Sequence, residues 1–139
     1  MSDGAPARLT IVNPPELGAP RGFAHGVVAP AGGRLLFVAG QTATGPDGRI
    51  TAESFAAQFE VALARVLAVV QAAGGQKEHV TRMTMYVTSI EDYRASRRTL
   101  RDVWGRHMGA HYPAMAVVQV TGLVDEGADV EIEADAVLP

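Results

Sequence analysis

The sequence contains no cysteine, which excludes disulfides, thiolate nucleophiles and thiolate metal sites. It also lacks an excess of basic residues. Its formal net charge is −3 at pH 7, which argues against general nucleic-acid binding. No apolar run approaches the length of a membrane span, and residues 1–9 lack the charged-then-apolar pattern of a leader. We therefore expect a cytoplasmic protein that binds neither nucleic acid nor membrane.

Motifs for common cofactors and nucleophiles are also missing. The chain has no G-x-G-x-x-G, no P-loop and no Ser-His-Asp order that supports a catalytic triad. His107 and His111 are four residues apart, which would suit a metal on a continuous helix. Gly109 and Pro113 argue against such a helix, and no third ligand is apparent. We predict no metal and no cofactor.

What is present fits one globular domain. The chain has 139 residues, of which 47% are hydrophobic and 19% charged, enough to bury a core without covalent support. We expect a single domain over residues 1–139, with residues 1–8 as a flexible tail.

Apolar periodicity and turn residues divide the chain into strands and two helices. Apolar residues recur every three or four positions over 51–73, and Ser89 offers an N-cap for a second helix that ends near 107. Strands are expected at 9–12, 23–28, 34–39, 79–88, 114–120 and 128–138. The strands on either side of A-P-A-G-G predict a hairpin. This order predicts an α/β (α+β) fold with a mixed sheet and two helices on one face.

The last two strands differ in pattern. Apolar and acidic residues alternate strictly in the strand over 128–138, so its apolar side chains lie on one face of the sheet and its acidic side chains on the other. The strand over 114–120 is apolar on both sides. We expect Met115, Val117 and Gln119 to lie on the face that the helices leave bare, and self-association to cover that face.

Four short motifs follow one another along the chain: F-V-A-G-Q-T at 37–42, A-A-G at 72–74, P-A-M-A-V-V-Q-V at 113–120 and V-E-I-E-A-D-A-V at 130–137. These motifs and their order resemble those of the Rid family, the YjgF-like reactive-intermediate deaminases. The chain resembles this family from about residue 22 to its end. The resemblance implies a chorismate-mutase-like fold and a homotrimer with a small-molecule cleft at each subunit boundary.

Glu131 is the candidate catalytic residue. From the strand pattern alone, a solvated acidic face is the favoured interpretation of Glu131, Glu133 and Asp135. The resemblance assigns a role to Glu131 only, as the glutamate that handles the attacking water or a proton. It also implies that the backbone amide of Gly40 orients the substrate.

The presumed cleft departs from the family pattern. Met115 stands where deaminating members carry an Arg that binds the substrate carboxylate, and Val117 where a Cys is frequent. Phe23, Ala39 and Arg97 replace a usual Tyr, Ser and Asn. These five residues, with Gly40, are the expected substrate-binding positions. The cleft is expected to be largely apolar, and its substrate not a simple 2-aminoacrylate-type acid.

Two further side chains have open roles. Arg97 could supply a positive charge to the cleft, but the pattern favours a solvated basic row with Arg94, Arg98 and Arg101. His25 lies on the same strand face as Phe23 and could enter the cleft as a base.

Two functions follow from this pattern. The first is hydrolytic, deaminase-type conversion of a small imine, enamine or related carbonyl compound. The alternative is a non-catalytic trimer that binds a small molecule or another protein and retains the fold.

Overall fold

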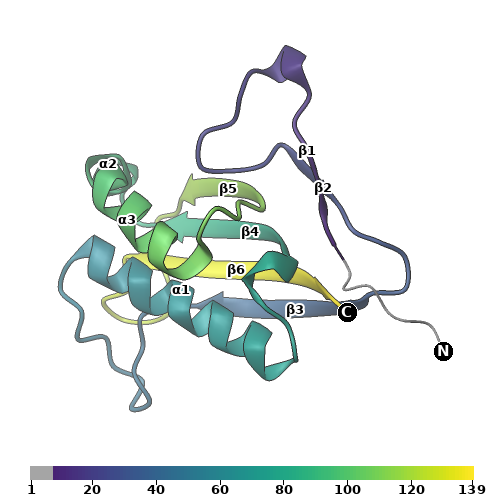
Figure 1. The fold of residues 1–139 in the computed structure, drawn as a ribbon. Helices are drawn as coiled ribbons and strands as arrows, with labels where there is room; N and C mark the ends of the chain where they lie inside the picture. The colour runs from purple at the N-terminus through teal and green to yellow at the C-terminus, as the bar shows by residue number, and fades with distance from the viewer. Residues whose placement is uncertain (1–7) are drawn as a thin grey trace.

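A computed structural model describes residues 8–139, so the tail prediction for residues 1–8 lies outside the described residues except at Arg8. The body is one four-stranded sheet with helices on a single face (Figure 1). Across the sheet the strands are β3 (Arg34–Gln41), β6 (Val130–Leu138), β4 (Val80–Val87) and β5 (Ala114–Gln119). β6 is antiparallel to both neighbours, whereas β4 and β5 are parallel. The predicted mixed sheet is confirmed.

The long helix α1 (Phe55–Ala72) lies across the sheet. It begins at Ser54, whose hydroxyl accepts a hydrogen bond from the Ala57 amide at 3.1 Å and so satisfies one of the free donors of the first turn. By length and composition α1 could cross a membrane, contrary to the expectation that no apolar run approaches that length. Its apolar stripe is buried against the sheet, as expected of a core helix.

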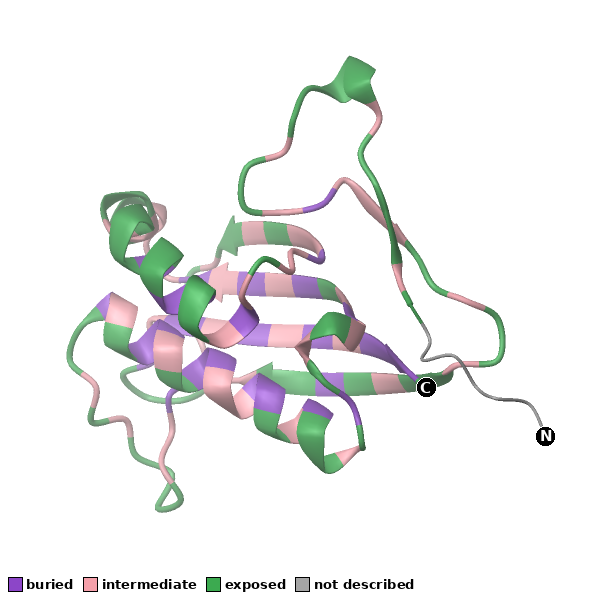
Figure 2. Ribbon diagram, in the orientation of Figure 1, coloured by how far each residue is buried: buried purple, intermediate pink, exposed green. Residues whose placement is uncertain are grey.

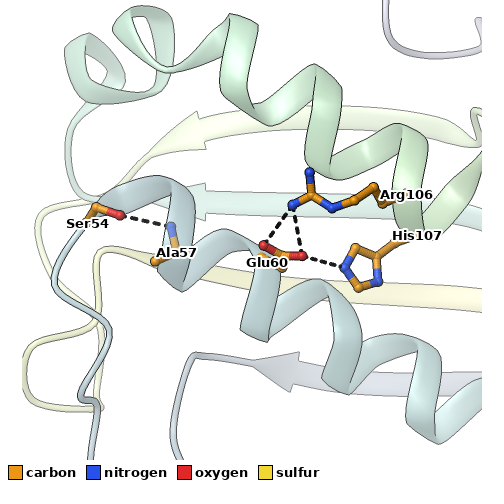
Figure 3. A network of polar contacts seen from close by, with 5 residues as sticks. All are labelled: Ser54, Ala57, Glu60, Arg106 and His107. Carbon is orange, nitrogen blue, oxygen red and sulfur yellow. Dashed lines mark hydrogen bonds and ion pairs between the residues drawn. The ribbon is translucent and has the colours of Figure 1, made fainter.

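The second predicted helix is two helices, α2 (Ile90–Ala95) and α3 (Arg97–Met108), separated at Ser96. The Ser89 hydroxyl caps α2 by accepting from the Asp92 amide at 3.1 Å, as the sequence indicates. α3 is joined to α1 through Glu60, which faces two residues of the last turn of α3 (Figure 3). A short 3-10 helix, η2 (Lys77–His79), leads into β4.

The core lies between the helices and one face of the sheet. The apolar side of β6 is buried there, with Val130 and Ile132 fully enclosed, and Met83 and Met85 of β4 lie beside them. The opposite face, which we call the open face, carries Glu131, Glu133 and Asp135 and has no helix over it. The strict alternation of β6 therefore predicted both of its faces correctly.

The N-terminal segment forms a separate arm that stands away from the sheet and is exposed along most of its length (Figure 2). It comprises β1 (Thr10–Val12), the 3-10 helix η1 (Pro15–Leu17) and β2 (Gly26–Val28). The predicted hairpin between 23–28 and 34–39 is wrong, because β2 pairs with β1 and not with β3. The arm contacts the body at β5, the edge of the sheet opposite to β3, where Ala24 forms a parallel bridge with Ala114.

The predicted orientation of β5 is also wrong. Met115 and Val117 pair in register with the buried Met83 and Met85 and pack against the core. It is Ala116 and Val118 that lie on the open face, in register with Thr84 and Tyr86. Because β5 is apolar on both sides, its pattern could not distinguish the two orientations.

Candidate functional site

The open face brings Glu131 and Gly40 together. Val38 pairs with Ala134 and Gln41 with Ile132, so one extra residue is accommodated in β3 between these pairs. Such bulges end regular pairing and often lie next to active sites. A Cβ added at Gly40 would overlap the Glu131 carboxyl group, with Cδ at 2.8 Å. Residue 40 therefore has to lack a side chain for the carboxylate to occupy this place.

The neighbouring carboxylate of Glu133 is engaged. The Tyr86 hydroxyl donates a hydrogen bond to Glu133 Oε1 at 2.7 Å, and this bond is the main reason why the pKa of Tyr86 is raised above its usual value. Among the residues described, Glu131 makes no such side-chain bond. Glu131 is half-buried, so its carboxylate remains accessible to a water molecule or a substrate.

Ala39 lines a hollow of about 410 Å³ on the same face. Phe37 is 73% exposed beside it, and Arg82 and Asp135 line its floor. Of the predicted substrate-binding residues, Gly40 thus lies beside the predicted catalytic Glu131, whereas Ala39 lines a hollow that Glu133 and Asp135 share.

A second, larger cavity of about 730 Å³ opens at the helix side of β5, and we call it the arginine pocket. It is lined by three arginines, four aromatic residues, three aliphatic side chains and one glycine: Arg21, Arg97, Arg101, Phe59, Tyr93, Trp104, Tyr112, Met85, Leu100, Met115 and Gly22. The predicted cleft residues Arg97 and Met115 therefore share one cavity.

Ring stacking, a hydrogen bond and a cation–π contact connect the residues that line the arginine pocket. The rings of Trp104 and Tyr112 are stacked, with centroids 5.5 Å apart and planes inclined by 7°. The indole Nε1 of Trp104 donates to the carbonyl of His111 at 3.1 Å. The guanidinium of Arg97 lies 6.0 Å above the Tyr93 ring, within the range of a cation–π contact.

The remaining candidates lie outside both cavities. Phe23 is half-buried within the arm, and its ring lies edge-on to that of His25, with the ring centroids 5.1 Å apart. His25 Nε2 lies 3.1 Å from the carbonyl of Gly18, so this ring is engaged within the arm. Val117 packs against the core and lines neither cavity.

The two histidines with metal-like spacing make separate contacts. His107 Nε2 lies 3.0 Å from Glu60 Oε1, and Arg106 donates to both Glu60 oxygens (Figure 3). His111 Nε2 lies 2.8 Å from the carbonyl of Val80. The hydrogen bonds from His107 and Arg106 lower the pKa of Glu60 below its usual value.

Within one chain the two groups of candidates do not meet. Glu131 and Gly40 lie on the open face, whereas Met115 and Arg97 lie on the helix side of the sheet. Sequence reasoning missed Arg21 and treated Arg101 as part of a solvated row. The spacing of Arg97 and Arg101, four residues apart on one helix, is the signal that could have placed both on one side of a cavity.

Comparisons with known proteins identify the family. Residues 16–138 match the family model described as Endoribonuclease L-PSP. The protein DfrA of Myxococcus xanthus is 33% identical over 106 residues, 76% of this chain and 77% of that protein. The 2-iminobutanoate/2-iminopropanoate deaminase of Bos taurus is 30% identical over 105 residues, 75% of this chain and 73% of that protein.

Solved structures agree. A Rid-family protein of unknown function, YyfB from Yersinia pestis, has a TM-score of 0.82 and 28% identity, over 94% of this chain and 99% of that chain. Escherichia coli TdcF, solved with bound serine, has a TM-score of 0.67 and 31% identity, over 88% of this chain and 92% of that chain. The sequence match, the four motifs and the shared fold lead to one conclusion: this chain belongs to the Rid family of YjgF-like proteins.

Proposed function

We propose that this chain is a cytoplasmic hydrolase that deaminates a small imine or enamine, in a homotrimer whose sites are each shared by two copies. The observation that carries the proposal is the Glu131 carboxylate lying against Gly40 at the bulge of β3. The relatives named as 2-iminobutanoate/2-iminopropanoate deaminases support the same reaction class.

Glu131 suits the proton transfers of this reaction. In imine hydrolysis, water adds to the C=N carbon and gives a carbinolamine. The C–N bond then breaks to release ammonia and leave a carbonyl compound. Glu131 takes a proton from the attacking water and returns it to the departing nitrogen. An enamine first takes a proton at carbon from the protonated carboxyl group of Glu131 and becomes the iminium ion. Water then adds to the iminium carbon, with the carboxylate left on Glu131 taking the proton of that water.

The sheet order supports a site shared between two copies. β3, which carries Ala39 and Gly40, and β5, which carries Met115, form opposite edges of the sheet. If the β3 side of one copy meets the β5 side of the next, Glu131 of one chain faces the arginine pocket of its neighbour. Head-to-tail contacts of this kind close into a ring. The open face, with Phe37 and Val118 exposed, then lies inside the ring.

The test compares two glutamates of one strand. Imines are generated in solution by an amino-acid oxidase, and the appearance of the 2-oxo acid is followed with and without the protein. We expect Glu131→Gln to reduce the rate enhancement by at least about 100-fold. Glu133→Gln is the matched control, because it changes the same residue type on the same face. Equal activity of wild type and Glu131→Gln would contradict the proposal.

A non-catalytic binding protein is the second candidate, and Met115 is the observation that favours it. A thioether cannot form the paired hydrogen bonds by which a guanidinium holds a carboxylate. For this candidate we expect no imine turnover by the wild type and unchanged ligand affinity in Glu131→Gln. Turnover that depends on Glu131 would exclude it.

A further inference from the structure

The arginine pocket concentrates positive charge in an otherwise acidic chain. Arg21, Arg97 and Arg101 line it, although the whole chain carries a net charge of −3. In residues 8–139 the ion pairs are those of Lys77 with Glu78 and of Glu60 with Arg106 and His107. None of the three pocket arginines belongs to these pairs, and no acidic side chain within that range lines the cavity. Their guanidinium groups are therefore available to an anion.

Apart from the arginines, the pocket is lined mainly by aromatic and apolar side chains. Phe59, Met85 and Leu100 are buried beneath it, and the stacked pair of Trp104 and Tyr112 forms one wall. Aromatic walls favour planar ligands that stack on them. A volume of about 730 Å³ lies within the range of sites for ring-bearing small molecules. A three- or four-carbon acid would leave most of this surface without a partner.

Arg97 and Arg101 are placed to act together. They are four residues apart on α3, on the side that also buries Leu100 and Trp104, and Arg21 approaches from the part of the arm between η1 and β2. Met115 lies in the same cavity. A guanidinium missing at residue 115 is thus replaced by guanidinium groups that come from other elements.

We propose that the arginine pocket binds the anionic group of a ligand that also carries a planar apolar body, with Arg97 and Arg101 as the specificity-determining residues. The inference rests on the proposed function and names its substrate class, a ring-bearing imine or enamine with a carboxylate or phosphate. It agrees with the expectation that the substrate is not a simple 2-aminoacrylate-type acid.

Calorimetric titration with four probes separates the requirements for charge, ring and kind of anion. The probes are phenylacetate, phenylacetamide, acetate and phenyl phosphate. We expect phenylacetate to bind about tenfold more tightly than the neutral amide and than acetate. Tighter binding of phenyl phosphate than of phenylacetate supports the phosphate form of the ligand, and the reverse order supports the carboxylate form. Equal affinity for phenylacetate and phenylacetamide, or no detectable binding of either anion with a ring, overturns the inference.

Matched variants test the residues. Arg97→Met and Arg101→Met should each weaken phenylacetate binding about tenfold, whereas Arg98→Met should change it by less than about twofold. Arg98 is an exposed arginine of the same helix that lies outside the pocket, so its loss removes the same charge. An equal loss in all three variants would mean that only the general field of the helix matters, and the pocket would be rejected.

The inference can fail separately from the proposed function. Glu131→Gln should retain phenylacetate binding while losing imine turnover. If Glu131→Gln abolishes imine turnover but the arginine variants bind phenylacetate as tightly as wild type, only the proposed substrate class is wrong. If the arginine variants lose phenylacetate binding but Glu131→Gln keeps full turnover, only the catalytic assignment of Glu131 is wrong.

Discussion

The carboxyl group of Glu131 occupies the space that a side chain at Gly40 would need. Gly40→Ala should therefore move the carboxylate and reduce imine turnover, by up to about 100-fold for a displacement near 1 Å. The fold should survive, because the displaced group is the end of a flexible side chain. Gly122→Ala is the control, since a Cβ there meets no atom within 4 Å. Steady-state kinetics of both variants measure the imine turnover, and thermal melts check that the fold is intact. Full activity in Gly40→Ala would separate residue 40 from the site.

Glu60 should make the stability of the helix layer depend on pH. Hydrogen bonds from His107 and Arg106 hold its pKa below the ordinary value of 4.5. A carboxyl group whose pKa is lowered by folding stabilises the fold above its unfolded pKa and loses that contribution as the pH falls through the folded pKa. The advantage of wild type over Glu60→Gln should therefore be present at pH 6 and should disappear below about pH 4.5.

The size of this effect is expected to be small. Glu60 and Arg106 have side-chain exposures of 37% and 57%, so solvent screens the pair and the contribution should stay below about 1 kcal/mol. Denaturant titrations of both proteins at several pH values measure it. A constant difference across the acid range would assign the effect to packing of the side chain instead of its charge.

Adjacent residues of β5 should affect assembly and folding separately. Val118→Asp adds a charge on the open face and should dissociate the proposed trimer while leaving each monomer folded. Val117→Asp places the charge against the core and should cost roughly 2 kcal/mol or more of unfolding free energy. Light scattering and thermal melts distinguish the two. A trimer that tolerates Val118→Asp would show that the open face is not the interface.

Met115→Arg should increase the affinity for small carboxylates. Residue 115 lines the arginine pocket, so the new guanidinium would reach the bound anion, and a two-pronged contact is expected to raise affinity about tenfold. Crowding with Arg97 and Arg101 offsets part of the gain by charge repulsion. Calorimetry with 2-oxobutanoate measures it, and Met115→Leu controls for shape. Unchanged affinity would place the bound carboxylate away from residue 115.

The features that were predicted correctly from the sequence have strong local signals. β6 alternates at every residue, and α1 combines a regular apolar stripe with a capping serine. The family resemblance assigned Glu131 and Gly40 to one cleft. The two residues lie next to each other, and their roles in the chemistry stay a prediction. Each of these features is encoded by residues close together in the sequence: one strand, one helix, or the short motif around the bulge of β3.

The features that were predicted wrongly depend on partners distant in the chain. The sequence over 23–39 shows two strands and a turn, a pattern that does not reveal whether the two strands pair with each other. The bridge between Ala24 and Ala114, residues far apart in the chain, instead holds the arm at the β5 edge of the sheet. The two faces of β5 are alike in polarity, so no pattern along it could assign Met115 to the helix side. The arginine pocket combines residues from the N-terminal segment and from α3, which no local pattern connects.

The stacked wall of the arginine pocket also gives the molecule an intrinsic optical probe. Trp104 is the only tryptophan in the sequence, so all indole fluorescence originates at one position, on the lining of this cavity. A planar anion that binds against the Trp104–Tyr112 pair would change the surroundings of the buried indole, and with them the emission maximum and the quenching of that one fluorophore. Occupancy of the cavity is thus readable in the native protein, without a label and at concentrations well below those of calorimetry.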